Sequence, residues 1–251
     1  TDHIFKPLGM NHTYWEYTQV PTSKLAYGYR WINNAWVKQP MEHDGAYGAM
    51  GGLITTLEDF SKYVALHLAA WPERDAPEIG PLKRSSLREM QFPWNMSGFN
   101  PSYIFPNGRK GSSVTAYGYG LSFMKDDLGK RSVGHSGGLP GFGSNWRIFP
   151  DYDLGIISFA NVTYAPASFI NLKVADSLIH SVQLSPRKIS PSEILKRRQA
   201  ELVKLLPNWE KAPESGIFAE NFFLDYFPEM LRSEAKAIFE KIGAIRTIHE
   251  I

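Results

Sequence analysis

The most constraining feature of the sequence is a glycine-rich segment, GHSGG at residues 134–138, that lies within a series of strand-like runs. Apolar runs at 143–149 and 154–160 follow it and are separated from each other by a Pro-Asp-Tyr-Asp turn. Such runs between turn residues predict three consecutive antiparallel strands, at 131–137, 143–149 and 154–160. Glycines at the rim of a sheet allow a ligand to approach the backbone closely and expose N–H groups to it.

Helical spacing of apolar residues and capping residues predict the other elements of the first 184 residues. A helix begins after Thr55 or Thr56, which is its N-cap, and ends near Trp71-Pro72. Further helices are expected at 81–90 and 165–182, and a short strand with an Asn33-Asn34 turn at 27–31. The stretch 95–113 is rich in Gly, Ser, Asn and Pro, which is typical of a loop.

The composition changes at 185–191, where two prolines fall among serines and basic residues. This segment is predicted to be a linker between a first domain at 1–184 and a second region at 192–251. In that region the sequence predicts a helix at 192–206, a short Phe-rich segment at 217–227, a second helix at 229–242 and the beginning of a strand at 245–251. We interpret 192–251 as the start of a small appended domain that is cut short at Ile251.

Charge and composition exclude several classes of protein. The net charge is +2 with scattered basic residues, which argues against nucleic acid as a partner. The chain has no cysteine, so thiol catalysis and disulfides are excluded. Its 7 histidines form no His-x-x-x-His pair, and no phosphate-binding glycine loop occurs, so neither a metal nor a cofactor is expected. No apolar run is long enough to span a membrane.

Three segments together resemble the serine β-lactamase, penicillin-binding protein and esterase superfamily, in particular its class C β-lactamase-like members. His135-Ser136-Gly137 corresponds to the Lys-Thr-Gly or His-Ser-Gly triplet of that family, and PLGM at 7–10 and GGLITTLED at 51–59 resemble two further family segments. The resemblance implies an α/β (α+β) fold with an antiparallel sheet flanked by helices and an adjoining helical domain. It further implies that this chain holds the last three strands and lacks the N-terminal part of the domain.

The family's nucleophile is the serine of a Ser-x-x-Lys motif on a helix, followed by a Tyr-x-Asn motif. In the family both precede the PLGM segment, so the resemblance implies a nucleophile upstream of Thr1. Three Ser-x-x-Lys spellings occur inside the chain and begin at Ser122, Ser185 and Ser233. They are expected on a strand, in the linker and on a solvent-exposed helix face, and we reject all three as nucleophiles.

The resemblance assigns roles to four residues of the glycine-rich segment. His135 would face the substrate carboxylate or assist proton transfer, and Ser136 would offer a hydroxyl to the substrate. Gly137 would contact the substrate, and the Gly138 N–H would donate to the oxyanion hole. From residue types alone, an ordinary strand histidine, a plain strand serine and a glycine-rich turn explain the same residues.

The expected activity of the complete protein is acyl transfer from an ester, amide or β-lactam to water. Histidine in place of the family's lysine favours an esterase-like or peptidase-like enzyme over a true β-lactamase. The expected partners are a small-molecule or peptide acyl substrate and the missing N-terminal portion, and the family implies a periplasmic or otherwise exported location. The alternative is a non-catalytic module that binds a peptide or a cell-wall fragment.

Overall fold

The computed structural model describes residues 1–43, 45–74, 77–78, 80–187 and 190–248. The chain divides into two compact units, Thr1–Arg187 and Lys188–Ile251, and the division falls within the segment 185–191 that the sequence marks as a linker.

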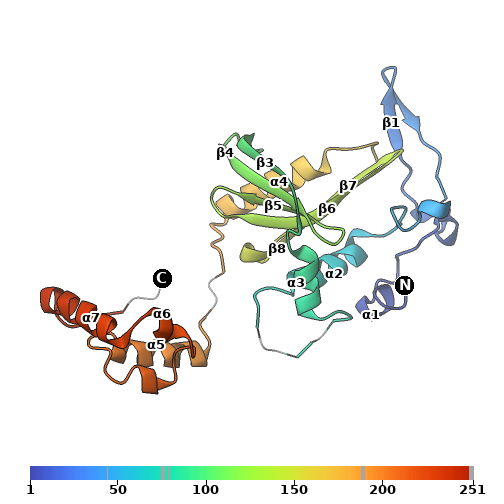
Figure 1. Cartoon of the computed structure of the whole chain (residues 1–251). Coiled ribbons are helices and arrows are strands. Elements are labelled where there is room, and N and C mark those ends of the chain that lie inside the picture. Colours follow the sequence, from blue (N-terminus) through green and yellow to red (C-terminus); the bar gives the residue numbers. More distant parts are fainter. Residues whose placement is uncertain (44, 75–76, 79, 188–189, 249–251) are drawn as a thin grey trace. The chain divides into compact units, whose positions relative to one another are not determined.

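A six-stranded antiparallel sheet forms the centre of the first unit (Figure 1). Its strands follow one another in chain order, so every neighbouring pair is joined directly. The strands are β3 (Asn95–Ile104), β4 (Lys110–Tyr117), β5 (Ser122–Asp126), β6 (Arg131–Leu139), β7 (Phe142–Phe149) and β8 (Leu154–Ala160).

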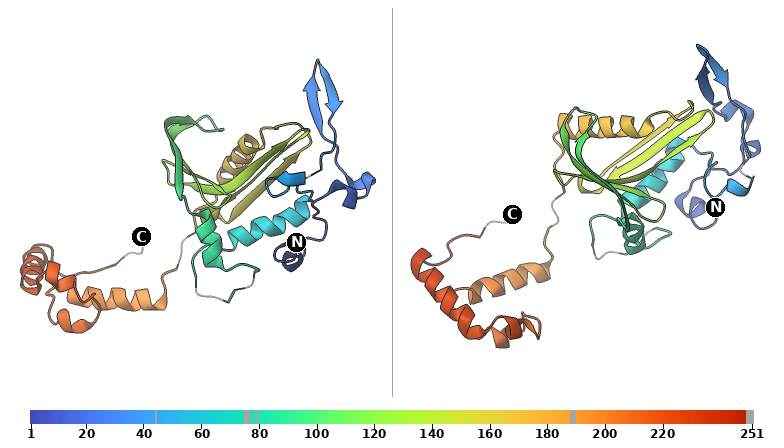
Figure 2. Two further views of the ribbon diagram at one scale, coloured as in Figure 1. Left: turned by 45° about the vertical axis from the view of Figure 1, so that its right-hand side comes forward. Right: turned by 45° about the horizontal axis from the view of Figure 1, so that its top comes forward.

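Two helices, α2 (Leu57–Leu68) and α4 (Ala167–Ser181), cover opposite faces of the sheet, as Figure 2 shows. The alternation along β7 explains this arrangement, because successive side chains of a strand point to opposite faces. Trp146 and Ile148 join the core cluster of α2, and Phe149 joins the cluster of α4. Ile148 and Phe149 are buried almost completely, and each such side chain contributes about 1.5–3 kcal/mol to stability.

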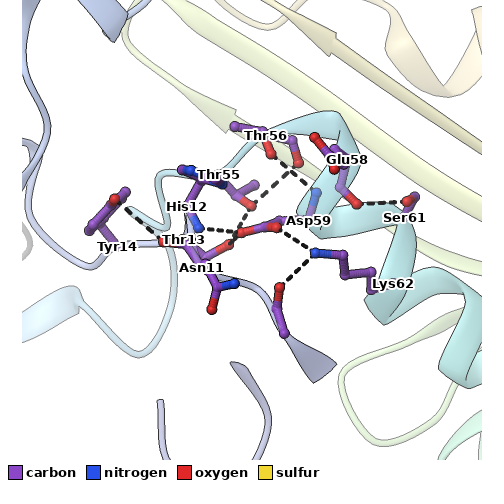
Figure 3. Close-up of polar contacts among 11 residues, drawn as sticks. Asn11, His12, Thr13, Tyr14, Thr55, Thr56, Glu58, Asp59, Ser61 and Lys62 are labelled. Atoms are coloured by element: carbon purple, nitrogen blue, oxygen red, sulfur yellow. Dashed lines mark hydrogen bonds and ion pairs between the residues drawn. The ribbon is translucent and has the colours of Figure 1, made fainter. Parts of the chain in front are cut away.

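Figure 3 shows how the beginning of α2 is fixed to the N-terminal segment. Thr56 is the N-cap and accepts a hydrogen bond from the Asp59 N–H at 3.1 Å. The buried Asp59 carboxylate accepts bonds from the His12 N–H at 2.6 Å, the Thr13 hydroxyl at 3.0 Å and the Lys62 ammonium at 3.0 Å. Burial opposes ionisation of Asp59, but these donors outweigh it and hold its pKa below the ordinary value.

A two-stranded hairpin, β1 (Tyr29–Ile32) and β2 (Ala35–Lys38), projects beside the turn between β6 and β7 (Figures 1 and 2). Asn33 and Asn34 form its two-residue loop with φ of 50° and 60°, which is the conformation of a type I′ turn. At its base the backbones of Gly28 and Gly141 touch, and a Cβ on Gly28 would lie 2.6 Å from the Gly141 Cα. Only glycine permits this approach, which attaches the hairpin to the sheet.

The remaining regular elements of the first unit are short. They are the helices α1 (Phe5–Leu8) and α3 (Arg84–Gln91), and the 3₁₀ turns at Tyr17–Gln19, Thr22–Lys24, Gly45–Tyr47 and Pro150–Tyr152. On α3, Leu87 is fully buried against Leu66 and Ala70, so this helix packs against α2.

The regular elements of the second unit are all helical among its described residues. It comprises α5 (Glu193–Leu205), α6 (Phe222–Asp225), α7 (Pro228–Ile242) and the 3₁₀ turn Pro213–Ser215. Its interior holds a stack of aromatic rings, in which the centroids of Phe218 and Phe222 are 4.6 Å apart. The strand predicted at 245–251 does not form over residues 245–248, and residues 249–251 lie outside the described part.

The expected fold class is confirmed, since an antiparallel sheet flanked by helices is present. The three predicted strands form as β6, β7 and β8, and the expected helices form as α2, α3 and α4. Two expectations are wrong: residues 95–113 contain the strands β3 and β4 rather than a loop, and the chain supplies six strands of the sheet rather than three. Within the described ranges, none of the helices combines the length and the apolar character that crossing a membrane requires.

Candidate active site

The glycine-rich segment lies on β6, where that strand changes from two neighbours to one. β5 pairs with β6 only as far as Gly134, whereas β7 pairs with it from Val133 to Leu139. Among the described residues, the stretch 135–139 is therefore paired along one edge only. An unpaired strand edge presents backbone N–H and C=O groups that another extended chain can bind.

His135 is exposed, and both of its ring nitrogens have partners. Its Nδ1 lies 2.6 Å from the Ser136 carbonyl oxygen, which can only accept, so Nδ1 carries the proton. The Tyr117 hydroxyl lies within hydrogen-bond distance of Nε2, at 2.9 Å. The two rings meet edge to face, with centroids 5.8 Å apart. With the proton on Nδ1, the Nε2 of a neutral His135 imidazole is an acceptor, which is the form that a general base requires.

Ser136 points to the opposite face of β6, because neighbouring side chains of a strand alternate. Its hydroxyl oxygen accepts a hydrogen bond from the Asn145 side-chain amide at 3.0 Å. Asn145 lies directly opposite on β7 and is 2% exposed, whereas Ser136 itself is exposed. The hydroxyl therefore lies at the boundary between a buried amide and solvent.

Gly137 and Gly138 leave room for neighbouring side chains. A Cβ on Gly137 would lie 2.6 Å from the Ser144 hydroxyl, and a Cβ on Gly138 would overlap the ring of Tyr164. Tyr164 follows β8 and is 69% exposed. Packing against Tyr164 is thus a structural reason for glycine at position 138, and it also places an aromatic ring beside the segment.

Behind the segment, Trp146 lies opposite His135 on β7 and packs into the aromatic cluster of α2. There the rings of Tyr63 and His67 lie 5.7 Å and 5.2 Å from the Trp146 ring. Burial lowers the pKa of His67 to about 4 and raises the pKa of Tyr63 above its ordinary value. Both groups are neutral at pH 7 and support the strand from inside the core.

The four predicted residues are consecutive on β6, and none of the rejected serines lies on that strand. Ser122 and Lys125 both lie on β5, where residues three apart point to opposite faces. Ser233 lies on α7 of the second unit, and the match that begins at Ser185 ends at Lys188, outside the described residues.

Sequence reasoning missed Tyr117, Asn145 and Tyr164, which contact the segment from elsewhere, and Asn171, which contacts Asn145. Tyr117 begins a YGYG motif at the end of a strand, and this motif is the one sequence signal for it. The described residues contain no group of three or more His, Asp and Glu side chains that could hold a metal ion.

Two curated proteins are similar to part of the chain. It is 27% identical to Beta-lactamase-like protein 4 of Dictyostelium discoideum over 184 residues, which cover 71% of this chain and 29% of that protein. It is 23% identical to the unguisins hydrolase ungD′ of Aspergillus campestris over 169 residues, which cover 65% of this chain and 28% of that protein. The chain thus matches less than a third of the length of either relative.

Solved structures with a similar fold include two penicillin-binding proteins. The octameric penicillin-binding protein homologue from Pyrococcus abyssi matches 80% of this chain and 41% of its own, with a TM-score of 0.53 and 25% identity. The penicillin-binding protein from Bacillus halodurans matches 71% of this chain and 48% of its own, with a TM-score of 0.52 and 18% identity. The family model described as Beta-lactamase matches residues 1–180, and the chain therefore belongs to the beta-lactamase family.

Proposed function

We propose that this chain is the C-terminal part of a serine hydrolase that transfers an acyl group from an ester or amide to water. The observation that carries the proposal is the GHSGG segment on a half-paired strand, with the exposed imidazole of His135 within it. The family and the hydrolase name of the Aspergillus relative support it. The nucleophilic serine of the proposal belongs to a Ser-x-x-Lys motif outside residues 1–251.

In this proposal each group of the segment has one task. The Gly138 N–H donates to the carbonyl oxygen as negative charge develops on it, and the nucleophile's own N–H is the second donor. The Nε2 of His135 accepts a proton or a hydrogen bond at the substrate, since the Tyr117 hydroxyl can rotate away from it. The Ser136 hydroxyl binds a polar group of the substrate. Histidine at position 135 supports an esterase or peptidase rather than a β-lactamase.

The test is ester hydrolysis by the complete protein, with p-nitrophenyl acetate as substrate. We expect His135→Ala to lower kcat/KM by about 100-fold, the lower range for loss of a general acid–base group. His180→Ala is the matched control, because His180 is an exposed histidine at the end of α4, and it should leave kcat/KM unchanged.

Two results would contradict the proposal. Equal kcat/KM for wild type and His135→Ala would remove His135 from the reaction. No hydrolysis of esters or amides by the folded wild type would favour the alternative, a non-catalytic module that binds a peptide or a cell-wall fragment.

A further inference from the structure

Four polar side chains form a continuous hydrogen-bonded series that runs from β8 through α4 and β7 to the glycine-rich segment on β6. Ser158 on β8 donates its hydroxyl to Asn171 Oδ1. Asn171 Nδ2 donates to Asn145 Oδ1 at 2.8 Å and to the Asn145 carbonyl oxygen at 2.9 Å. Asn145 Nδ2 in turn donates to Ser136 Oγ at 3.0 Å and to the His135 carbonyl oxygen at 3.1 Å. The series joins three strands and one helix.

The direction of donation in this series follows from its two backbone carbonyls. The His135 carbonyl oxygen can only accept, so Asn145 must turn its NH₂ group toward β6 and its oxygen toward α4. The Asn145 carbonyl oxygen likewise requires the NH₂ group of Asn171. Both amides are therefore fixed in one orientation, and Ser136 Oγ is an acceptor from the protein. The Ser136 O–H group can therefore donate its hydrogen bond to a group on the solvent side.

Burial makes this orientation rigid. Asn145 is 2% exposed and Asn171 is 0% exposed, so water cannot replace either amide partner. Buried amides without partners are costly, and a fully bonded series resists rotation of any one member. Ser136 at the end of the series is exposed. Apolar residues would pack equally well between a sheet and a helix. The two buried asparagines instead form a hydrogen-bonded series that ends at one exposed hydroxyl.

We propose that Asn145 and Asn171 are positioning residues that hold the Ser136 hydroxyl as a hydrogen-bond donor to an acceptor group of the substrate, such as a carboxylate or carbonyl. This inference rests on the proposed hydrolase function and adds two buried residues that orient its Ser136 contact. Asn145 holds Ser136 directly, and Asn171 holds Asn145. The position of α4 is thereby coupled to the geometry of the segment.

A double-mutant cycle in the complete protein tests the proposal with p-nitrophenyl acetate and an ester whose acyl part carries a carboxylate. Asn145→Leu should lower kcat/KM for the carboxylate ester by about tenfold, the usual effect of one hydrogen bond. In a Ser136→Ala background the same change should lower kcat/KM by less than about twofold, because the hydroxyl that it orients is absent. Asn171→Leu should act in the same direction as Asn145→Leu.

Gln91→Leu is the matched control, because it also removes a buried amide, one whose hydrogen bonds go to Trp71 and His67 and not to the segment or to Asn145. It should lower the melting temperature and leave kcat/KM unchanged. If Asn145→Leu does not fold, Asn145→Ala replaces it without adding apolar bulk. The inference would be overturned if the losses in kcat/KM from Asn145→Leu and Ser136→Ala were additive, or if folded Asn145 variants kept an unchanged kcat/KM. Neither result would contradict the hydrolase function. An inactive wild type would overturn the hydrolase function as well, so the two failures are distinguishable.

Discussion

Two histidines of this chain occupy opposite environments, one exposed to solvent and the other in the core. His135 is exposed with a tyrosine hydroxyl on one ring nitrogen and a carbonyl on the other. His67 is 1% exposed, and its Nδ1 accepts a hydrogen bond from the Gln91 side chain at 3.3 Å. Only the first can meet a substrate, and only the second is tied to the folding equilibrium through burial.

His67 should make stability depend on pH. Its pKa is lowered by burial to about 4 in the folded protein, against an ordinary value of 6.5 in the unfolded chain. Between these values the unfolded chain binds more protons, so stability falls as pH falls from 6.5 to 4. The loss should reach about 3 kcal/mol.

Urea unfolding of wild type and His67→Gln between pH 7.5 and pH 4 measures this contribution. The difference between the two proteins should be constant above pH 6.5 and shrink below it, because glutamine does not titrate. A difference that stays constant down to pH 4 would show that His67 is not held neutral in the core.

For single residues, the sequence predicts the position of those that lie within a motif. It misses those that strand pairing or helix packing brings to the motif from elsewhere in the chain. His135 and Ser136 are adjacent to diagnostic glycines, so their place on an exposed strand follows from the motif. Tyr117 is 18 residues from His135, and Asn171 is 26 residues from Asn145. Their contacts depend on strand register and on the packing of α4, neither of which a single motif contains.

Among the elements, α2 depends on a polar anchor at its first turn. The Asp59 carboxylate joins the helix to residues 12 and 13, and Lys62 extends the same anchor by donating to the Gly9 carbonyl at 2.6 Å (Figure 3). We expect Asp59→Ala to lower the free energy of unfolding by about 2–3 kcal/mol, because it leaves buried donors without an acceptor.

Glu58→Ala is the control for this change, since Glu58 is an exposed acid one residue earlier in the same turn. It should cost no more than about 1 kcal/mol, the value of a surface charge near a helix N-terminus. Urea unfolding at pH 7 compares the two variants. Equal losses would mean that the acidic charge, rather than the buried hydrogen bonds, stabilises the helix start.

The strands of the sheet differ in how well sequence patterns predict them. The strands β6 to β8 carry apolar runs and turn residues, so their existence and approximate ends are predictable. β3 lies at the sheet edge, is exposed along nearly its whole length and has two register shifts against β4. Its Gly98 and Pro101 are typical of loops, and edge strands tolerate both residues. Because no buried face imposes alternation, the sequence of β3 gives no periodic signal.

The two edge strands of the sheet, β3 and β8, differ in how readily they can pair with a strand of another molecule. The register shifts and Pro101 of β3 disrupt pairing with another strand. β8 reads LGIISFA without a charge or a proline, and within the described residues its outer edge has no paired strand. A neutral, apolar, unpaired edge of this kind is a site of self-association.

We therefore expect the 251-residue chain to self-associate with rising concentration through β8. Phe159→Lys should reduce this association, because Phe159 is 40% exposed on β8 and a lysine there disfavours pairing of two such edges. Leu128→Lys adds the same charge in the exposed turn before β6 and should have no effect. Light scattering against concentration compares the three proteins, and equal association of all three would exclude β8 as the contact.

The most direct test of the hydrolase account is the location of a fluorophosphonate label. The protein isolated from its natural source is treated with the probe, and the adduct is mapped by intact mass and peptide mass spectrometry. The account predicts one adduct, on a serine of a Ser-x-x-Lys motif outside residues 1–251. An adduct on a serine of this 28.4 kDa chain, or no adduct on the folded protein, would contradict it.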